Sequence, residues 1–315
     1  MDALATLSSP VVLAFLLGLS AALLKSDLRL PEQVHGFLSL YLLLAIGLKG
    51  GVGLRDADLG DLVLPVVVTL VLGVVTPLIA FGTLRRLTRL DRTDRAALAA
   101  HYGSTSLVTF TAAVAALDAA RVEMEGYLAT LLAVLEVPGI IVGLLLAGRV
   151  AAGGNRSSAL REVLTGKSVL LLIGGLTIGA ITGASGYVAV EPFFGGLFQG
   201  VLVLFLLDLG VMAGQRLRDL PQAGTGLVVA AIVLPLVNGS LGVLGGTAAG
   251  LSTGGAAILG VLAASASYIA APAAVRLALP SANPAYYLTS SLGITFPFNL
   301  VIGIPLFLAM SRALS

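Results

Sequence analysis

The sequence predicts an all-α integral membrane protein in which ten transmembrane helices form two inverted five-helix repeats. Three observations carry this prediction. Hydrophobic residues make up 57% of the 315 residues and charged residues only 11%, whereas soluble domains carry about 25% charged residues. The apolar residues gather in runs of about 20, the length needed to cross a bilayer. Motifs of the first half also recur in the same order in the second half.

Short connections join the apolar runs, and none of them could hold a soluble domain. The ten runs cover residues 4–24, 33–54, 62–84, 96–117, 127–148, 168–186, 194–215, 225–249, 256–278 and 286–310. The longest connection, residues 151–167, separates an N-terminal repeat (1–150) from a C-terminal repeat (168–315). The chain begins without a basic segment, so we expect its first apolar run to be retained rather than cleaved.

Basic residues are distributed unevenly between the two sides of the predicted helices. Connections after odd-numbered spans hold fourteen Lys and Arg, and those after even-numbered spans, with the C-terminal end, hold three. Cytoplasmic loops are enriched in Lys and Arg. The pattern therefore predicts that both termini lie outside the cytoplasm, on the periplasmic or extracellular side of the membrane.

The repeat is visible as three matches in order. Residues 42–56 match 205–219 at an offset of 163, 96–117 match the ninth span at 161, and Tyr127 to Pro138 match Tyr286 to Pro297 at 159. Five crossings is an odd number, so the second copy must be inserted upside down. Inverted repeats of this kind are typical of secondary transporters, which bind substrate near the midplane.

Spans four and nine are each interrupted by small hydroxyl residues, and Pro272 should open the ninth helix because it cannot donate to the Tyr268 carbonyl. Opened backbone at membrane depth lines a protein interior or a wet cavity. Each second half-helix then directs its positive N-terminal end at the middle, which favours a small anion. The candidate substrate-binding residues are Gly103, Ser104, Thr105, Ser106, Ser265, Ala266, Ser267 and Tyr268. In the alternative interpretation, these hydroxyls bond only to their own or neighbouring helices.

Glu136 is the strongest candidate for binding a coupling cation, because acids inside a span are costly and usually functional. Thr109, Thr295 and Asn299 could complete the all-oxygen shell that hard cations prefer. The sequence thus predicts a site for a coupling cation, formed by Glu136 with these three residues. The alternative is an acid that is paired structurally or kept protonated.

Two further charges, Lys49 and Asp208, lie in spans two and seven. Intramembrane charges usually pair with each other, so we expect a buried ion pair that fixes the packing of these helices. The alternative is that Lys49 attracts the anion during gating. His101 is expected to be structural and His35, near an interface, to be inert.

Several function classes are disfavoured. The chain has no Cys and two His, which argues against disulfides, redox chemistry and metal clusters. No constellation of catalytic residues is evident, so we expect no enzyme activity and no cofactor. Nucleic-acid binding is not expected, since the basic loop 85–95 is typical of a topology or lipid signal. A channel is harder to exclude.

Four motifs make the chain resemble the SbtA family of sodium-dependent bicarbonate permeases. They are HYGSTSLVTF (101–110), the Glu-Val-Pro of 136–138, ASASYIAAPAAVRLALPSANP (264–284) and GITFPFNLVIGIP (293–305). The resemblance implies sodium-coupled uptake of bicarbonate across the inner membrane by a homotrimer. It also implies a core of spans three to five and eight to ten that moves against a gate of spans one, two, six and seven.

The chain departs from the cyanobacterial pattern of that family at Tyr268 and Ala270, which replace a carboxylate and a hydroxyl that would serve a cation. We therefore expect one Na⁺ per anion rather than two, and another small anion such as a carboxylate is an alternative cargo. A PII-like regulator is known for cyanobacterial members. The short connection between the repeats weakens the case for such a partner here.

Overall fold

The computed structural model describes residues 9–148 and 155–315. Within these ranges the regular elements are helices. The first half contains α2 (Pro10–Leu23), α3 (Glu32–Asp56), α4 (Leu59–Leu87), α5 (Arg92–Gly103), α6 (Leu107–Ala119) and α7 (Leu128–Leu146). The second half contains α8 (Arg156–Thr165), α9 (Lys167–Val188), α10 (Glu191–Phe194), α11 (Phe198–Leu217), α12 (Leu220–Ala248), α13 (Thr253–Ala264), α14 (Ala270–Ala278), α15 (Pro284–Leu288), η2 (Thr289–Thr295), α16 (Phe296–Phe298), η3 (Asn299–Gly303) and α17 (Ile304–Leu314).

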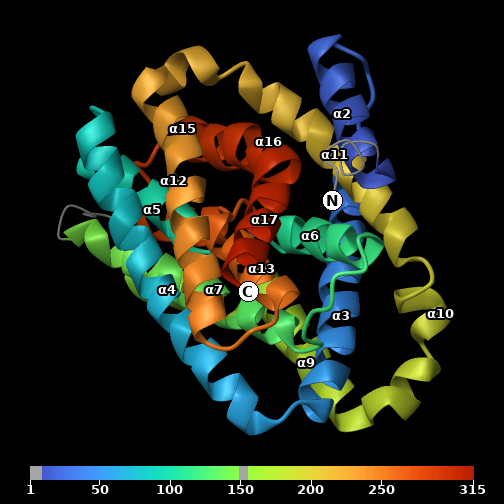
Figure 1. Ribbon diagram of the computed structural model, residues 1–315. Helices are drawn as coiled ribbons and strands as arrows, with labels where there is room; N and C mark the ends of the chain where they lie inside the picture. The colour runs from blue at the N-terminus through green and yellow to red at the C-terminus, as the bar shows by residue number, and fades with distance from the viewer. Residues whose placement is uncertain (1–8, 149–154) are drawn as a thin grey trace.

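Each predicted apolar run coincides with one helix or with a consecutive group of helices (Figure 1). Among the described residues, seven helical stretches are long and apolar enough to cross a membrane, which confirms an all-helical membrane protein. The number of ten crossings stays a prediction. Residues 151–154 of the predicted connection and Arg149 lie outside the described residues, and residues 156–165 of that connection form α8.

The predicted interruptions of the fourth and ninth runs are present. The fourth run is divided between α5 and α6, and the ninth between α13 and α14, by short non-helical segments. Pro272 is the third residue of α14, where its missing N–H leaves no hydrogen bond unmade. The chain therefore opens before Pro272, over residues 265–269.

Glycines let two helix pairs approach to backbone contact. On α3, a Cβ added at Gly47 would lie 2.8 Å from the Leu172 carbonyl oxygen of α9. On α11, a Cβ added at Gly210 would lie 2.1 Å from the Phe15 carbonyl oxygen of α2. Small residues of this kind allow close packing where helices have no hydrophobic drive to associate.

These two helix contacts correspond to each other under the sequence repeat. A Cβ at Gly175 of α9 would lie 3.1 Å from the Leu48 backbone nitrogen, and one at Gly18 of α2 would lie 3.0 Å from that of Val211. Leu48 and Val211 are 163 positions apart, the offset at which Gly47 matches Gly210. The α3–α9 and α2–α11 pairs are thus built from equivalent contacts, which supports the internal repeat.

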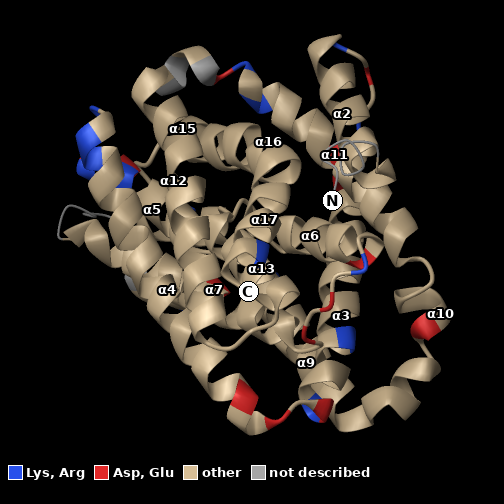
Figure 2. Ribbon diagram, viewed as in Figure 1, with Lys and Arg blue, Asp and Glu red and all other residues tan. Residues whose placement is uncertain are grey.

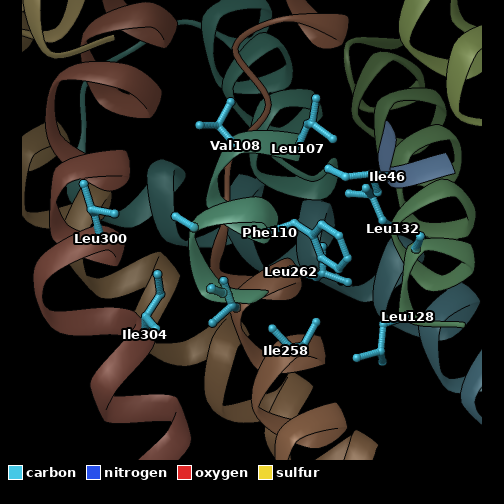
Figure 3. Packing of buried hydrophobic residues seen from close by; sticks show 14 of the residues in the cluster. Ile46, Leu107, Val108, Phe110, Leu128, Leu132, Ile258, Leu262, Leu300 and Ile304 are labelled. Carbon is cyan, nitrogen blue, oxygen red and sulfur yellow. The ribbon is translucent and has the colours of Figure 1, made fainter. Parts of the chain in front are cut away.

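The interior is apolar around the interrupted helices. Every residue of α13 from Gly254 to Ala264 is buried, as expected for a helix that is hydrophobic on all sides. Its Ile258 and Leu262 belong to the same buried cluster as Phe110 of α6 and Leu300 of η3 (Figure 3). Charged residues instead lie mainly at helix ends and in loops (Figure 2).

A polar corner connects the start of α5 to the start of α15. The Asp94 carboxylate accepts a hydrogen bond from the Asn283 backbone nitrogen at 2.8 Å. Asn283 in turn caps α15, since its side-chain oxygen accepts from the Ala285 nitrogen at 2.9 Å. The PSANP motif (280–284) therefore forms a capped turn that is held against the other half of the chain.

The glycine contacts predict that substitutions at two glycines of α9, Gly174 and Gly179, differ in their effect on stability. A Cβ at Gly179 would lie 2.2 Å from the Leu48 carbonyl oxygen, whereas nothing lies within 4 Å of one at Gly174. Gly179→Ala should therefore destabilise the protein by about 1–3 kcal/mol through overpacking. Gly174→Ala should be neutral or slightly stabilising because alanine favours helix. Thermal unfolding in detergent measures both, and equal effects would contradict the α3–α9 contact.

Candidate substrate and cation site

The two chain interruptions touch each other directly. The Ser267 backbone nitrogen donates to the His101 carbonyl oxygen at 2.9 Å. The Ser106 backbone nitrogen donates to the Ser265 hydroxyl at 2.9 Å, and the hydroxyl oxygens of Thr105 and Ser265 are 3.2 Å apart. Polar backbone released from both helices is therefore satisfied across the crossing, as burial requires.

The serines at the crossing divide into two groups by the bonds that they make. Ser104 donates to the Glu136 carbonyl oxygen at 3.0 Å, and Ser265 donates to the Leu262 carbonyl at 2.7 Å. Ser106 instead accepts from the Thr109 nitrogen at 3.2 Å, and Ser267 accepts from the Ala271 nitrogen at 3.2 Å. Since an accepting hydroxyl keeps its own hydrogen, Ser106 and Ser267 each have one hydrogen to donate. The Ser106 hydroxyl has the Tyr268 hydroxyl as a neighbour that can accept it.

A small cavity lies at this crossing, with a volume of about 10 Å³, room for roughly one water molecule. Of the predicted substrate-binding residues, Thr105, Ser106, Ser267 and Tyr268 line it. The others, Gly103, Ser104, Ser265 and Ala266, do not contribute to its lining. The two serines that accept from backbone nitrogens thus line the cavity, and the two that donate to backbone carbonyls lie outside its lining.

Glu136 lines the same cavity from α7 and is only 6% exposed. Among the described residues no ion pair involves it. Its position follows from the close packing of α5 and α7, because a Cβ at Gly139 would lie 1.7 Å from the Gly103 carbonyl oxygen. Gly103 therefore lets α7 approach α5 closely, and it does not line the small cavity.

The other predicted cation ligands are buried but do not line the small cavity. Thr295 donates to the Ala231 carbonyl oxygen at 2.7 Å, which Pro235 leaves without its helical partner. The Asn299 amide donates to the Ala264 carbonyl at 2.9 Å, whereas its side-chain oxygen is buried without a partner among the described residues. Thr109, at 1% exposure, is the third residue of α6, the helix that Ser106 caps.

Thr295 and Asn299 belong to the two π-helical stretches η2 and η3, on either side of Pro297. Tyr102 of α5 lies 2.8 Å from the Thr295 hydroxyl. Thr295 hydrogen-bonds to Ala231 of α12 and to Tyr102 of α5, so it mainly connects these two helices to η2. The π-helical turns are of the kind often found at functional sites.

The predicted ion pair between Lys49 and Asp208 is not formed, and this expectation was wrong. Asp208 of α11 instead lies 2.6 Å from the imidazole of His35, so His35 is not inert. The physical reason is that the two residues of α3 lie at different heights along the helix. Lys49 follows His35 by 14 residues, which is about 21 Å along the helix axis, so Asp208 cannot reach both. The expectation for His101 is compatible with its bond to the Ala97 carbonyl at 2.7 Å, in a fully buried position.

Lys49 is exposed and lines a second, much larger cavity of about 630 Å³. This cavity lies between α3, α6, α7, α10 and α11 and includes residues of the connection before α7. Asp118, Glu125 and Glu191 also line it. No group of three or more His, Cys, Asp or Glu suited to a metal ion occurs among the described residues.

Sequence reasoning missed two contributors to the site. Ser168, at the start of α9, lines the small cavity together with Glu136. It stands at the edge of an apolar run with no repeat partner to mark it. Gly139 was also missed, although its position one residue after the Glu136–Pro138 motif could have suggested a close helix contact.

Comparison with known proteins identifies one family. Residues 10–312 match the sequence model of the Na⁺-dependent bicarbonate transporter superfamily. Comparison with curated proteins gave no match.

The crossing predicts a large cost for removing one hydroxyl. In Ser265→Ala, the buried Ser106 nitrogen loses its acceptor, and an unsatisfied buried donor costs about 1–3 kcal/mol. Ser291→Ala is a matched control, because Ser291 is equally buried at 1% exposure but bonds only to the Tyr287 carbonyl of its own helix. Thermal unfolding should show the larger loss for Ser265→Ala. Equal losses would show that the crossing does not depend on this hydroxyl.

Proposed function

Because the chain belongs to the Na⁺-dependent bicarbonate transporter superfamily, we propose that it takes up bicarbonate together with Na⁺ by alternating access. The observation that carries this proposal is the small cavity at the crossing. There, free hydroxyl donors from two interrupted helices and a buried carboxylate face one space. This combination suits an anion and a cation that travel together.

The anion is assigned to the side of the cavity formed by the interruptions. Ser106 and Ser267 each keep a hydrogen to donate, and they come from opposite helices. Helices α6 and α14 begin next to them, at Leu107 and Ala270. Their N-terminal ends add partial positive charge, which favours a small oxyanion such as bicarbonate.

The cation is assigned to Glu136. A buried carboxylate is costly unless a positive charge accompanies it, and Na⁺ prefers oxygen ligands of this kind. The unpartnered side-chain oxygen of Asn299 supports its inclusion as a second ligand. Thr109 and Thr295 stay candidate ligands, and the hydrogen bonds of Thr295 argue for a structural role first.

Transport requires the walls of the cavity to separate, since about 10 Å³ is too small for bicarbonate. Ser168 of α9 belongs to the proposed gate (α2, α3, α9 and α11). The other polar residues of the lining belong to the proposed core, formed by α4 to α7 and α12 to α17. The glycine contacts join the gate helices tightly in pairs. We infer that the core moves past the gate, and that inverted repeats supply the two access states.

The energetics favour one Na⁺ for each bicarbonate. Bringing an anion into a negative interior costs about 2.3 kcal/mol per 100 mV, and one accompanying Na⁺ cancels this charge. A tenfold Na⁺ gradient then supplies about 1.4 kcal/mol, enough for a tenfold accumulation. From the resemblance and the distribution of basic residues we retain a homotrimer in the inner membrane with external termini.

A small carboxylate remains the alternative cargo, because Ser106 and Ser267 would donate to carboxylate oxygens in the same way. Competition in proteoliposomes separates the two. Unlabelled bicarbonate should suppress uptake of labelled bicarbonate at concentrations where acetate does not.

Glu136→Gln tests the cation assignment. The amide keeps the shape but removes the charge, so Na⁺-stimulated bicarbonate uptake into proteoliposomes should fall by at least about tenfold, the loss expected for about 1.4 kcal/mol of binding. Glu32→Gln, at an exposed position in the first turn of α3, is the control and should retain uptake. Unchanged Na⁺ dependence in Glu136→Gln would rule out this role.

The stoichiometry predicts how uptake responds to voltage. With one Na⁺ per bicarbonate, accumulation at a fixed Na⁺ gradient should not change when a K⁺ diffusion potential of about 100 mV is imposed. With a second Na⁺, the same potential would add about 2.3 kcal/mol, an increase of about 50-fold. Tracer accumulation with valinomycin present distinguishes the two, and a voltage-driven increase would refute the single-cation ratio.

A further inference from the structure

The large cavity and the small cavity are both lined by α6. Phe110 and Thr111 line the large one, and Ser106 and Leu107 line the small one. Phe110 follows Leu107 by three residues, about 4.5 Å along the helix axis. The two spaces therefore approach each other along this helix, at its end nearest the crossing.

Apolar side chains occupy the region where the two cavities approach. Ile46 and Leu107 are each 8% exposed and Phe110 is 4% exposed, and all three belong to one buried cluster. Figure 3 shows the ring of Phe110 directed toward Leu132 and Leu262 of that cluster. Because such interiors are close-packed, these side chains block passage between the cavities.

Charged side chains indicate that the large cavity holds water. Lys49, seven residues before the end of α3, is exposed there and forms no ion pair among the described residues. An unpaired lysine at this depth is tolerated where it faces a water-filled space. Asp118 near the end of α6, Glu125 in the following connection and Glu191 at the start of α10 line the cavity nearer to the helix ends.

We propose that the large cavity is the access vestibule of the transporter, and that Ile46, Leu107 and Phe110 form an apolar plug between it and the small cavity. The proposal rests on the proposed transport function and adds the route to the site. Ile46 belongs to α3 of the gate, and Leu107 and Phe110 belong to α6 of the core. Movement of the core past the gate would therefore separate the two sides of the plug.

The absence of Cys from the sequence allows a direct test, since an introduced cysteine is the sole thiol. Ala270→Cys places a thiol on the small cavity and Ala115→Cys places one on the large cavity. The large cavity is lined by the connection after α6 and by α10, which lie on the external side in the predicted topology. Intact cells are therefore treated from outside with a membrane-impermeant methanethiosulfonate bearing a sulfonate group. The labelling rate is measured for each thiol, with Phe110 and with Phe110→Ala.

The thiol of Ala115→Cys should react quickly in both backgrounds. That of Ala270→Cys should react slowly with Phe110 and about an order of magnitude faster in Phe110→Ala, because truncation leaves a void in place of the ring. Phe110→Leu disturbs the packing less and should give an intermediate labelling rate. It replaces Phe110→Ala in the comparison if that variant folds poorly. Equal rates for Ala270→Cys in all backgrounds, or an unreactive Ala115→Cys, would overturn the proposal.

This readout needs no transported substrate. A chain that moves a different anion would still show the plug, and a chain without the plug could still take up bicarbonate. Failure of the access route and failure of the proposed function are thus distinguished.

Discussion

The structure depends on one constraint: polar backbone that leaves a helix inside the membrane must find partners within the protein. At the crossing, each interruption supplies partners for the other, through the Ser265 hydroxyl and the His101 carbonyl. The same constraint explains why Thr295 bonds to the Ala231 carbonyl that Pro235 exposes. The hydroxyls at the crossing therefore differ: those of Ser104 and Ser265 donate to backbone carbonyls, whereas that of Ser267 keeps its hydrogen.

Much of the fold could be predicted from the sequence, because hydropathy and proline act locally. The apolar runs, the interruptions of two of them, and the place of Pro272 in the first turn after its interruption follow from residue type and spacing. Helix α8 was not expected, since its ten residues carry no apolar run long enough to stand out.

The site was predictable in composition but less so in detail. Repeat matching identified the segments that meet, yet which serine donates to which atom depends on distances that spacing does not contain. The pairing of Asp208 with His35 rather than Lys49 shows the same limit. Two charges on neighbouring helices pair only if they lie at the same height along the helix axes, and spacing along the sequence does not give that height.

The capped turn at PSANP changes how the family resemblance should be understood. Asn283 is occupied with starting α15 and with binding Asp94 across the two halves, so the most distinctive motif of the chain encodes a structural joint. Neither Asn283 nor Asp94 lines the small or the large cavity. Proteins that share the motif can thus be expected to share an architecture while differing in the solute they carry, and cargo should be inferred from the residues around Ser106, Ser267 and Glu136 instead.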